Sequence, residues 1–148
     1  MGNKFEFKLQ KLLDIRMKEE DFSKMEFKRA LEDRNMIANK IDELESTYSK
    51  YNIFSTEDNL MDRKLKVSYL KFLTSSIDKA NIELNKKTEI LNIKRVDLNK
   101  KQIRRKTVET LKCNDYSEFL KEEKLFQQKL NDELALYGFM RKNKELVK

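Results

Sequence analysis

The sequence predicts an all-α protein, folded as a long antiparallel two-helix coiled-coil hairpin with an extended second helix. Of its 148 residues 40% are charged, and it contains Gly 2 and Pro 0, a composition typical of long helices. Apolar residues recur at spacings of three and four nearly end to end, which favours helix over the disorder that a highly charged chain otherwise suggests. Only the segment 52–62 loses this period, so a single hairpin, residues 1–148, is the expected organisation.

The first helix is expected from about residue 5 to residue 51. Its seam, spaced alternately by four and three residues as in a coiled coil, is apolar at Leu9, Leu13, Phe27, Ala30, Ile37, Ile41, Leu44, Tyr48 and Tyr51. Polar residues hold four further seam positions, Arg16, Glu20, Ser23 and Arg34. The half of the helix nearer residue 51 is therefore the better coiled-coil strand.

The turn is expected at about 52–62, where Asn, Ser, Thr and Asp concentrate. These side chains hydrogen-bond to nearby backbone and so favour turns and caps. Ser55 or Thr56 is the predicted N-cap of the next helix, and Glu57 and Asp58 would favour its first turn because acidic groups interact well with a helix N-terminus.

The second helix is expected at about 63–145. One row repeats every seventh residue, first Leu70, Ile77, Leu84, Leu91 and Leu98, then Phe119, Phe126 and Met140 after Arg105 and Lys112. The companion row is predicted four residues further on, at the polar positions Thr74, Asn81, Thr88, Arg95 and Gln102. Helix propensity is low at 113–115, so a kink is expected near 113–116.

The turn forces the two helices to run in opposite directions. With the tip placed near residue 54, Leu9 lies opposite Asn99, and roughly forty residues of the second helix, about 60 Å at 1.5 Å per residue, extend without a partner. The overhang carries an apolar stripe that needs a covering surface: Phe119, Phe126, Leu130, Tyr137 and Met140.

No catalytic, metal or cofactor site is expected. The chain has His 0 and Cys 1 and lacks a glycine-rich phosphate loop, and a two-helix hairpin encloses no cleft for an enzyme. The acidic pairs Glu19-Glu20, Glu122-Glu123 and Asp132-Glu133 are interpreted as solvated helix surface, since sequence neighbours do not share a helix face. A cytoplasmic location is expected for four reasons. The lone Cys113 fits a reducing compartment, and the charged N-terminus lacks the apolar core of a signal peptide. Glu6 stands where the myristoylation motif requires Ser or Thr, and the sequence has no apolar run long enough to span a membrane.

The formal net charge is +7 with pI ≈ 9.3, which points to an acidic partner surface or nucleic acid. Most of the excess lies in a basic strip made of Lys94, Arg95, Lys100, Lys101, Arg104, Arg105 and Lys106. No aromatic residue interleaves the strip, so a base-stacking platform is absent. Phosphate binding, binding of acidic protein and plain solvation with ion pairing across the seam remain open for it.

Aromatic side chains crowd the expected tip: Tyr48, Tyr51, Phe54, Tyr69 and Phe72. They either pack together and hold the end of the hairpin closed, or form a partly exposed patch of the kind that anchors protein interfaces.

The two ends of the chain resemble the FliJ family, coiled-coil components of the bacterial flagellar type III export apparatus. The opening Phe5-Glu6-Phe7-Lys8-Leu9-Gln10-Lys11-Leu12-Leu13-Asp14-Ile15-Arg16, followed by Glu19-Glu20, is similar to the start of the family. Glu109-x-Leu111-Lys112, Tyr116, Glu123 and Gln128-Lys129-x-x-Asp132-Glu133-x-Ala135 resemble its C-terminal signature, and Tyr69-x-x-Phe72 sits where the family often has an aromatic pair.

The resemblance implies three kinds of partner: the hexameric export ATPase, the cytoplasmic part of the membrane export gate, and export chaperones. It also implies a peripheral place at the cytoplasmic face of the membrane. The residues we expect to dock onto the ATPase are Phe5, Leu9, Leu12, Leu13, Phe119, Phe126, Leu130, Asp132, Glu133 and Met140. Those expected to contact the gate are Tyr48, Tyr51, Tyr69 and Phe72. The competing hypothesis is a nucleic-acid-associated or structural coiled coil that uses the basic strip.

Overall fold

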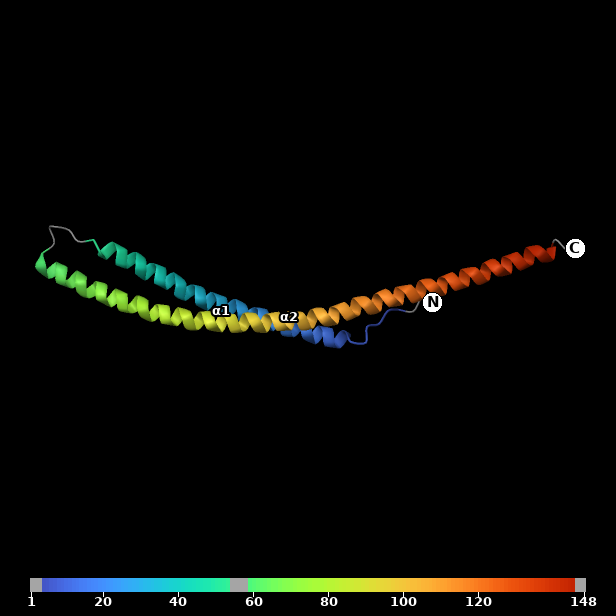
Figure 1. Ribbon diagram of the computed structural model, residues 1–148, viewed down its shortest axis with the longest axis horizontal. Coiled ribbons are helices and arrows are strands. Elements are labelled where there is room, and N and C mark those ends of the chain that lie inside the picture. Colours follow the sequence, from blue (N-terminus) through green and yellow to red (C-terminus); the bar gives the residue numbers. More distant parts are fainter. Residues whose placement is uncertain (1–3, 54–58, 146–148) are drawn as a thin grey trace. The chain divides into compact units, whose positions relative to one another are not determined.

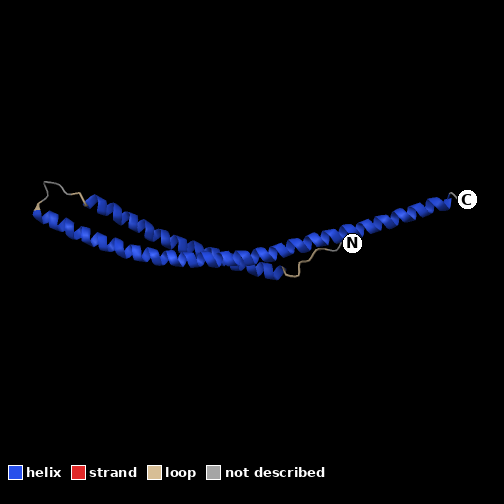
Figure 2. Cartoon of the chain, in the orientation of Figure 1, coloured by secondary structure: helices blue, strands red, loops and turns tan. Residues whose placement is uncertain are grey.

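The computed structural model describes residues 4–53 and 59–145, and this part of the chain consists of two helices and short non-helical segments (Figures 1 and 2). Helix α1 is Gln10–Tyr51 and helix α2 is Leu60–Glu145. They pack against each other and run in opposite directions, which confirms the predicted all-α hairpin. The predicted cap at Ser55 or Thr56 lies outside the described residues; at the start of α2, the amide of Leu60 donates to Oδ1 of Asn59 at 2.7 Å.

The chain divides into two compact units, each built from parts of both helices. The hairpin unit comprises residues 18–102, and the terminal unit comprises residues 1–17 together with 103–148. Each unit has its own contacts between the N-terminal and C-terminal halves of the chain.

In the hairpin unit the two helices keep one antiparallel register. Lys87 Nζ donates to Asp33 Oδ2 at 3.0 Å, and Lys94 Nζ donates to Glu26 Oε2 at 3.0 Å. Near the other end of α1, the rings of Tyr51 and Tyr69 meet edge to face with centroids 5.0 Å apart. The two residue numbers in each of these pairs add up to the same value, so the antiparallel register of α1 and α2 is constant from the tyrosine pair to the ion pairs.

The sevenfold row predicted on α2 lies in the interface. Leu70 and Leu91 are buried, and Ile77, Leu84 and Leu98 are half-buried. The predicted companion row lies only partly in the interface, because Thr88 and Gln102 are half-buried whereas Thr74, Asn81 and Arg95 are exposed. The more buried row lies three residues further on instead of four. This second row is Leu73, Ala80, Lys87, Lys94 and Lys101. A lysine fits such a position because its aliphatic stem packs while its ammonium reaches an acid or water.

The seam of α1 contains buried polar residues, as its sequence predicts. Ser23 is 0% exposed and Glu20 is 3% exposed. Glu20 is bonded to Lys24 one turn away, with 2.9 Å between Oε1 and Nζ, and Ser23 reaches Asp97 on α2. These bonds matter because a buried polar group without a partner costs free energy.

In the terminal unit α1 begins at Gln10, later than the expected residue 5. Residues 4–7 are not helical, and the amide of Gln10 donates to the carbonyl of Phe7 at 3.0 Å. Both aromatic residues of this non-helical segment contact α2: Phe7 is buried with Val108, and Phe5 lies against Tyr116 and Phe119.

The core of the terminal unit is small and apolar. Phe7 and Leu13 are buried with Val108 of α2, and Leu12 packs against them. The ring of Phe5 contacts the rings of Tyr116 and Phe119, with centroids 5.1 Å and 5.6 Å away.

The expected pairing of Leu9 with Asn99 is therefore wrong. Gln10 instead accepts a hydrogen bond from Lys112 Nζ at 2.7 Å. The N-terminal segment contacts α2 as far as Phe119, so the part of α2 beyond this contact is shorter than the expected forty residues.

Residues 113–116, where a kink is predicted, do not interrupt α2, which continues as helix from Leu60 to Glu145. Cys113, Asn114 and Asp115 are exposed on its surface. The low helix propensity of each of these residues costs at most about 0.7 kcal/mol of helix stability. The helix-favouring neighbours and the contacts of Tyr116 offset this cost.

Candidate functional site

The largest candidate surface is the end of α2 that follows Phe119 in the terminal unit. Phe126 is 63% exposed, and Leu130, Tyr137 and Met140 are exposed with it. With Phe119 they recur at helical spacing, so they form one stripe along the helix. Exposed apolar stripes of this length mark protein interaction sites.

This part of α2 also carries exposed apolar residues that the heptad row does not include. Leu125, Leu136 and Phe139 are more than half exposed and lie on the face that adjoins the stripe, and Leu120 and Leu134 lie on its other side. The apolar surface therefore extends around more than half of the helix circumference. The stripe was predicted from one heptad row, and the signal for the rest was the density of Leu and Phe outside that row.

The residues predicted to dock onto the ATPase fall into three groups. Leu13 is buried in the core, and Phe5, Leu12 and Phe119 are half-buried in the contact between the N-terminal segment and α2. The remaining members are exposed: Leu9, Phe126, Leu130, Asp132, Glu133 and Met140. The structure thus brings the first two groups together and presents the last group to solvent.

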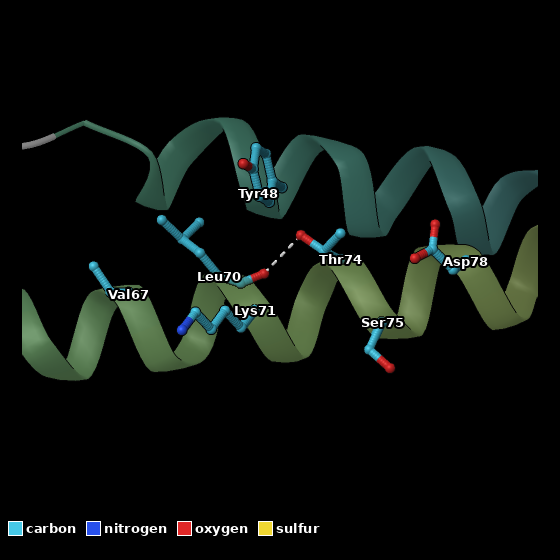
Figure 3. A pocket seen from close by; sticks show the side chains of 7 residues that line it. All are labelled: Tyr48, Val67, Leu70, Lys71, Thr74, Ser75 and Asp78. Atoms are coloured by element: carbon cyan, nitrogen blue, oxygen red, sulfur yellow. Dashed lines mark hydrogen bonds between the residues drawn. The ribbon is translucent and has the colours of Figure 1, made fainter.

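A second candidate surface lies in the hairpin unit near the loop (Figure 3). There, Tyr48 of α1 and six residues of α2 line an open groove of about 420 Å3. The α2 residues are Val67, Leu70, Lys71, Thr74, Ser75 and Asp78. The hydroxyl of Thr74 donates to the carbonyl of Leu70 at 2.9 Å, so its methyl group and the Tyr48 ring leave the groove largely apolar.

The four residues predicted to contact the gate differ in how they are held. Tyr51 and Tyr69 pack against each other, and Tyr48 is half-buried. Phe72 is 65% exposed. The tip is therefore both a packed end and an exposed surface, and Phe72 contributes to the exposed surface. Phe54 lies outside the described residues.

The basic strip is partly neutralised. Lys94 pairs with Glu26, Lys101 Nζ lies 3.0 Å from Asp97 Oδ2, and Arg105 pairs with Glu109 one turn away. Hydrogen bonds from Lys101 and then from Ser23 hold the pKa of Asp97 below its usual value. Arg95, Lys100, Arg104 and Lys106 are exposed. The strip therefore combines ion-paired and solvent-exposed basic side chains.

The described residues offer no set of three or more His, Cys, Asp or Glu side chains placed to hold a metal ion. Within the same residues, none of the helices has an apolar stretch long enough to cross a membrane.

Comparison with protein families decides the classification. A family model described as "Flagellar FliJ protein" matches residues 5–144. The chain belongs to the FliJ family. It is accordingly a component of the flagellar export apparatus, and the FliJ family comprises structural export components, not known enzymes. No curated protein and no solved structure matches the chain.

Proposed function

We propose that this FliJ family protein is an export adaptor that docks onto the flagellar export ATPase through its terminal unit, promotes assembly of the ATPase hexamer and raises its rate of ATP hydrolysis. It supplies no catalytic group. Its hairpin unit contacts the cytoplasmic part of the export gate, and it serves export chaperones at the cytoplasmic face of the membrane.

The observation that carries the ATPase proposal is the apolar surface of α2 beyond Phe119. It extends around more than half of the helix, and Phe126 and Tyr137 are 63% and 68% exposed. Exposure of such a surface to water is unfavourable by a free energy of about 25 cal/mol per Å2 of apolar area. A flat partner covers one face of a helix, whereas the central opening of a ring covers several faces at once.

Charge supports the same proposal. Lys121, Lys124, Lys129 and Arg141 are exposed beside the apolar surface, and they would steer the helix toward an acidic opening. The N-terminal segment adds Leu9, while the contact of Phe5 with Phe119 fixes that segment on α2.

The gate proposal rests on the exposed side of the tip. Phe72 is the most exposed of its four aromatic residues, and the nearby groove beside Tyr48 is open and largely apolar. Aromatic residues of this kind are enriched at interface hot spots.

The ATPase proposal is tested with a chain that ends at Lys121. A cut at Arg104 would also remove Val108, Tyr116 and Phe119, the partners of the N-terminal segment. A cut after Lys121 keeps these contacts and removes most of the exposed apolar surface. We expect the full chain to raise phosphate release by the purified ATPase and to shift it toward hexamers, and the shortened chain to do neither.

A matched pair of full-length variants provides the control. Phe126→Ser with Tyr137→Ser removes two apolar side chains from the stripe, and Lys121→Ser with Lys124→Ser changes two exposed polar positions of the same helix. The first pair should abolish most of the stimulation and the second should only reduce it. If the chain ending at Lys121 stimulates as well as the full chain, the ATPase proposal is wrong.

A further inference from the structure

A second apolar stripe runs along α2 in the hairpin unit, on the face turned away from α1. Its apolar members Ile82, Ile93 and Val96 are 58%, 67% and 52% exposed. They belong to a row that alternates by three and four residues and whose other members are Ser75, Lys79, Lys86, Glu89 and Lys100. An open groove lies along it, lined by Ile93, Val96, Asn92, Asp97 and Lys100. This spacing is that of a coiled-coil seam, so a further helix can pack there.

The stripe is complementary to itself in one antiparallel register. When Ile82 is set opposite Ile93 of a second copy, the twofold axis sets Ile93 opposite Ile82 as well. In the same register Lys86 lies opposite Glu89 of the second copy, again twice. Glu89 is the stripe's acidic residue, and Lys79 then lies over Val96 of the second copy, where its stem can pack.

Registers displaced by seven residues lose the contact between the two isoleucines. In one of them Ile93 lies opposite Glu89. In the other Ile82 lies opposite Lys86, although Lys79 then lies opposite Glu89. Only the register that joins Ile82 to Ile93 combines contact between these isoleucines with charge pairing. Closed twofold pairing also requires that one patch match itself, and this patch does so in both apolar and charged layers.

We infer that the occupant of this face is a second copy of the same chain, paired antiparallel through α2 in the register that joins Ile82 to Ile93 and Lys86 to Glu89. The charged members of the stripe support the same pairing. Among the described residues, Lys79, Lys86 and Lys100 form no ion pair, whereas Lys87 and Lys94 of the seam facing α1 each do. The apolar layers are few, so the dimer is weak and forms as the protein concentration rises.

A charge exchange tests the register. The full chain is studied by sedimentation equilibrium across a wide range of concentrations, with circular dichroism as the check on folding. Glu89→Lys alone and Lys86→Glu alone should each weaken the dimer by roughly tenfold, since two exposed pairs are lost and replaced by repulsion. The double variant Lys86→Glu with Glu89→Lys should restore it, because the exchanged charges meet again across the axis.

Cysteine crosslinking gives an independent measurement. In a Cys113→Ser chain, Ile82→Cys together with Ile93→Cys should form a covalent dimer on mild oxidation. Ile82→Cys alone should not, because its two copies lie about 16 Å apart along the axis, beyond the ~7 Å that a disulfide spans between Cα atoms. A wild-type chain that stays monomeric at every concentration overturns the inference. So does a double charge variant no better than the single ones, or equal crosslinking of the two cysteine chains.

Discussion

Ser23 and Asp97 form a hydrogen bond between α1 and α2, with 2.9 Å from Oγ to Oδ2. Ser23 is fully buried, and Asp97 also accepts a bond from Lys101. A small polar group thus holds a seam position where a coiled coil usually has an apolar residue. Such polar positions fix the register of the helices at a cost in stability.

This arrangement predicts a small effect for Ser23→Ala and a larger one for Leu73→Ala. Removal of the Ser23 hydroxyl should lower the free energy of unfolding by about 1 kcal/mol, since Asp97 keeps its bond to Lys101. Leu73 is 2% exposed, and its truncation should cost about 2–3 kcal/mol because a cavity remains. Urea unfolding followed by circular dichroism measures both. A Ser23→Ala chain as unstable as Leu73→Ala would contradict the interpretation.

The same carboxylate predicts a dependence on acid. The pKa of Asp97 is lower in the folded chain, so its stabilising contribution is present above about pH 4, its unfolded range, and is lost as the pH falls through the folded value. Asp97→Asn removes this contribution. Thermal unfolding should therefore show wild type losing more stability than Asp97→Asn between neutral pH and strong acid. Parallel pH curves for the two chains would refute this.

Lys24 predicts a dependence of stability on alkaline instead of acidic pH. Its hydrogen bond to Glu20 raises its pKa. A raised pKa contributes stability below the ordinary value near 10.4, and that contribution is lost as the pH rises through the folded value. Wild type should therefore be more stable than Lys24→Gln at neutral pH, and thermal unfolding should show this difference in stability disappearing as the pH rises above ~10.

The aromatic contacts of Phe5 predict a local effect in the terminal unit. Phe5→Ala removes the ring that packs on Tyr116 and Phe119, and each such ring pair contributes about 0.5–1.5 kcal/mol. Hydrogen exchange of α2 amides around residues 112–119 should become faster, and exchange in the hairpin unit should stay unchanged. Lys4→Ala, an exposed neighbour, is the control and should change neither.

Phe72 provides the sharpest test of the gate contact. Phe72→Ala should weaken binding to the cytoplasmic part of the gate by tenfold or more, in the range of an interface hot spot of about 2 kcal/mol, and leave helicity unchanged. Phe22→Ala is the matched control, because Phe22 is 59% exposed on α1. Tyr69→Ala is less informative, since it also removes the ring contact with Tyr51. Equal losses for Phe72→Ala and Phe22→Ala would show that the tip is not the contact.

The basic strip predicts weak binding of nucleic acid. Lys94, Lys101 and Arg105 are paired with acids, and only the unpaired members can neutralise phosphates. Binding of DNA or RNA should therefore disappear near physiological salt, since each phosphate contact is lost as counterions compete. Tight binding at ~0.15 M salt that is removed by Lys100→Ala with Arg104→Ala would instead favour the nucleic-acid hypothesis.

The heptad row from Leu70 to Leu98 could be predicted from sequence because apolar residues fill every seventh position. Its companion row could not, since Lys87 and Lys94 bury their stems and place their charges on Asp33 and Glu26. A hydropathy pattern counts a lysine as exposed, although four of its side-chain carbons are apolar.

The register and the N-terminal segment were missed for different reasons. Pairing in a hairpin depends on where the tip lies, and an apolar seam repeats every heptad, so sequence alone permits several registers. The cross-helix pairs Glu26–Lys94 and Asp33–Lys87 fix it within the hairpin unit. The segment at residues 4–7 was expected to begin the first helix, but it is not helical, and Phe5 and Phe7 reach α2 from outside α1.

The shared register of α1 and α2 also restricts how the length of such a protein can change. One residue inserted into α1 between Glu26 and Asp33 would rotate and shift every later partner, so the ion pairs on the two sides of it could not both survive. A longer or shorter hairpin keeps its seam only if both helices gain or lose whole heptads at the same level. Changes in the connection between Tyr51 and Leu60 escape this rule, which makes that connection the place where relatives can differ in length at little energetic cost.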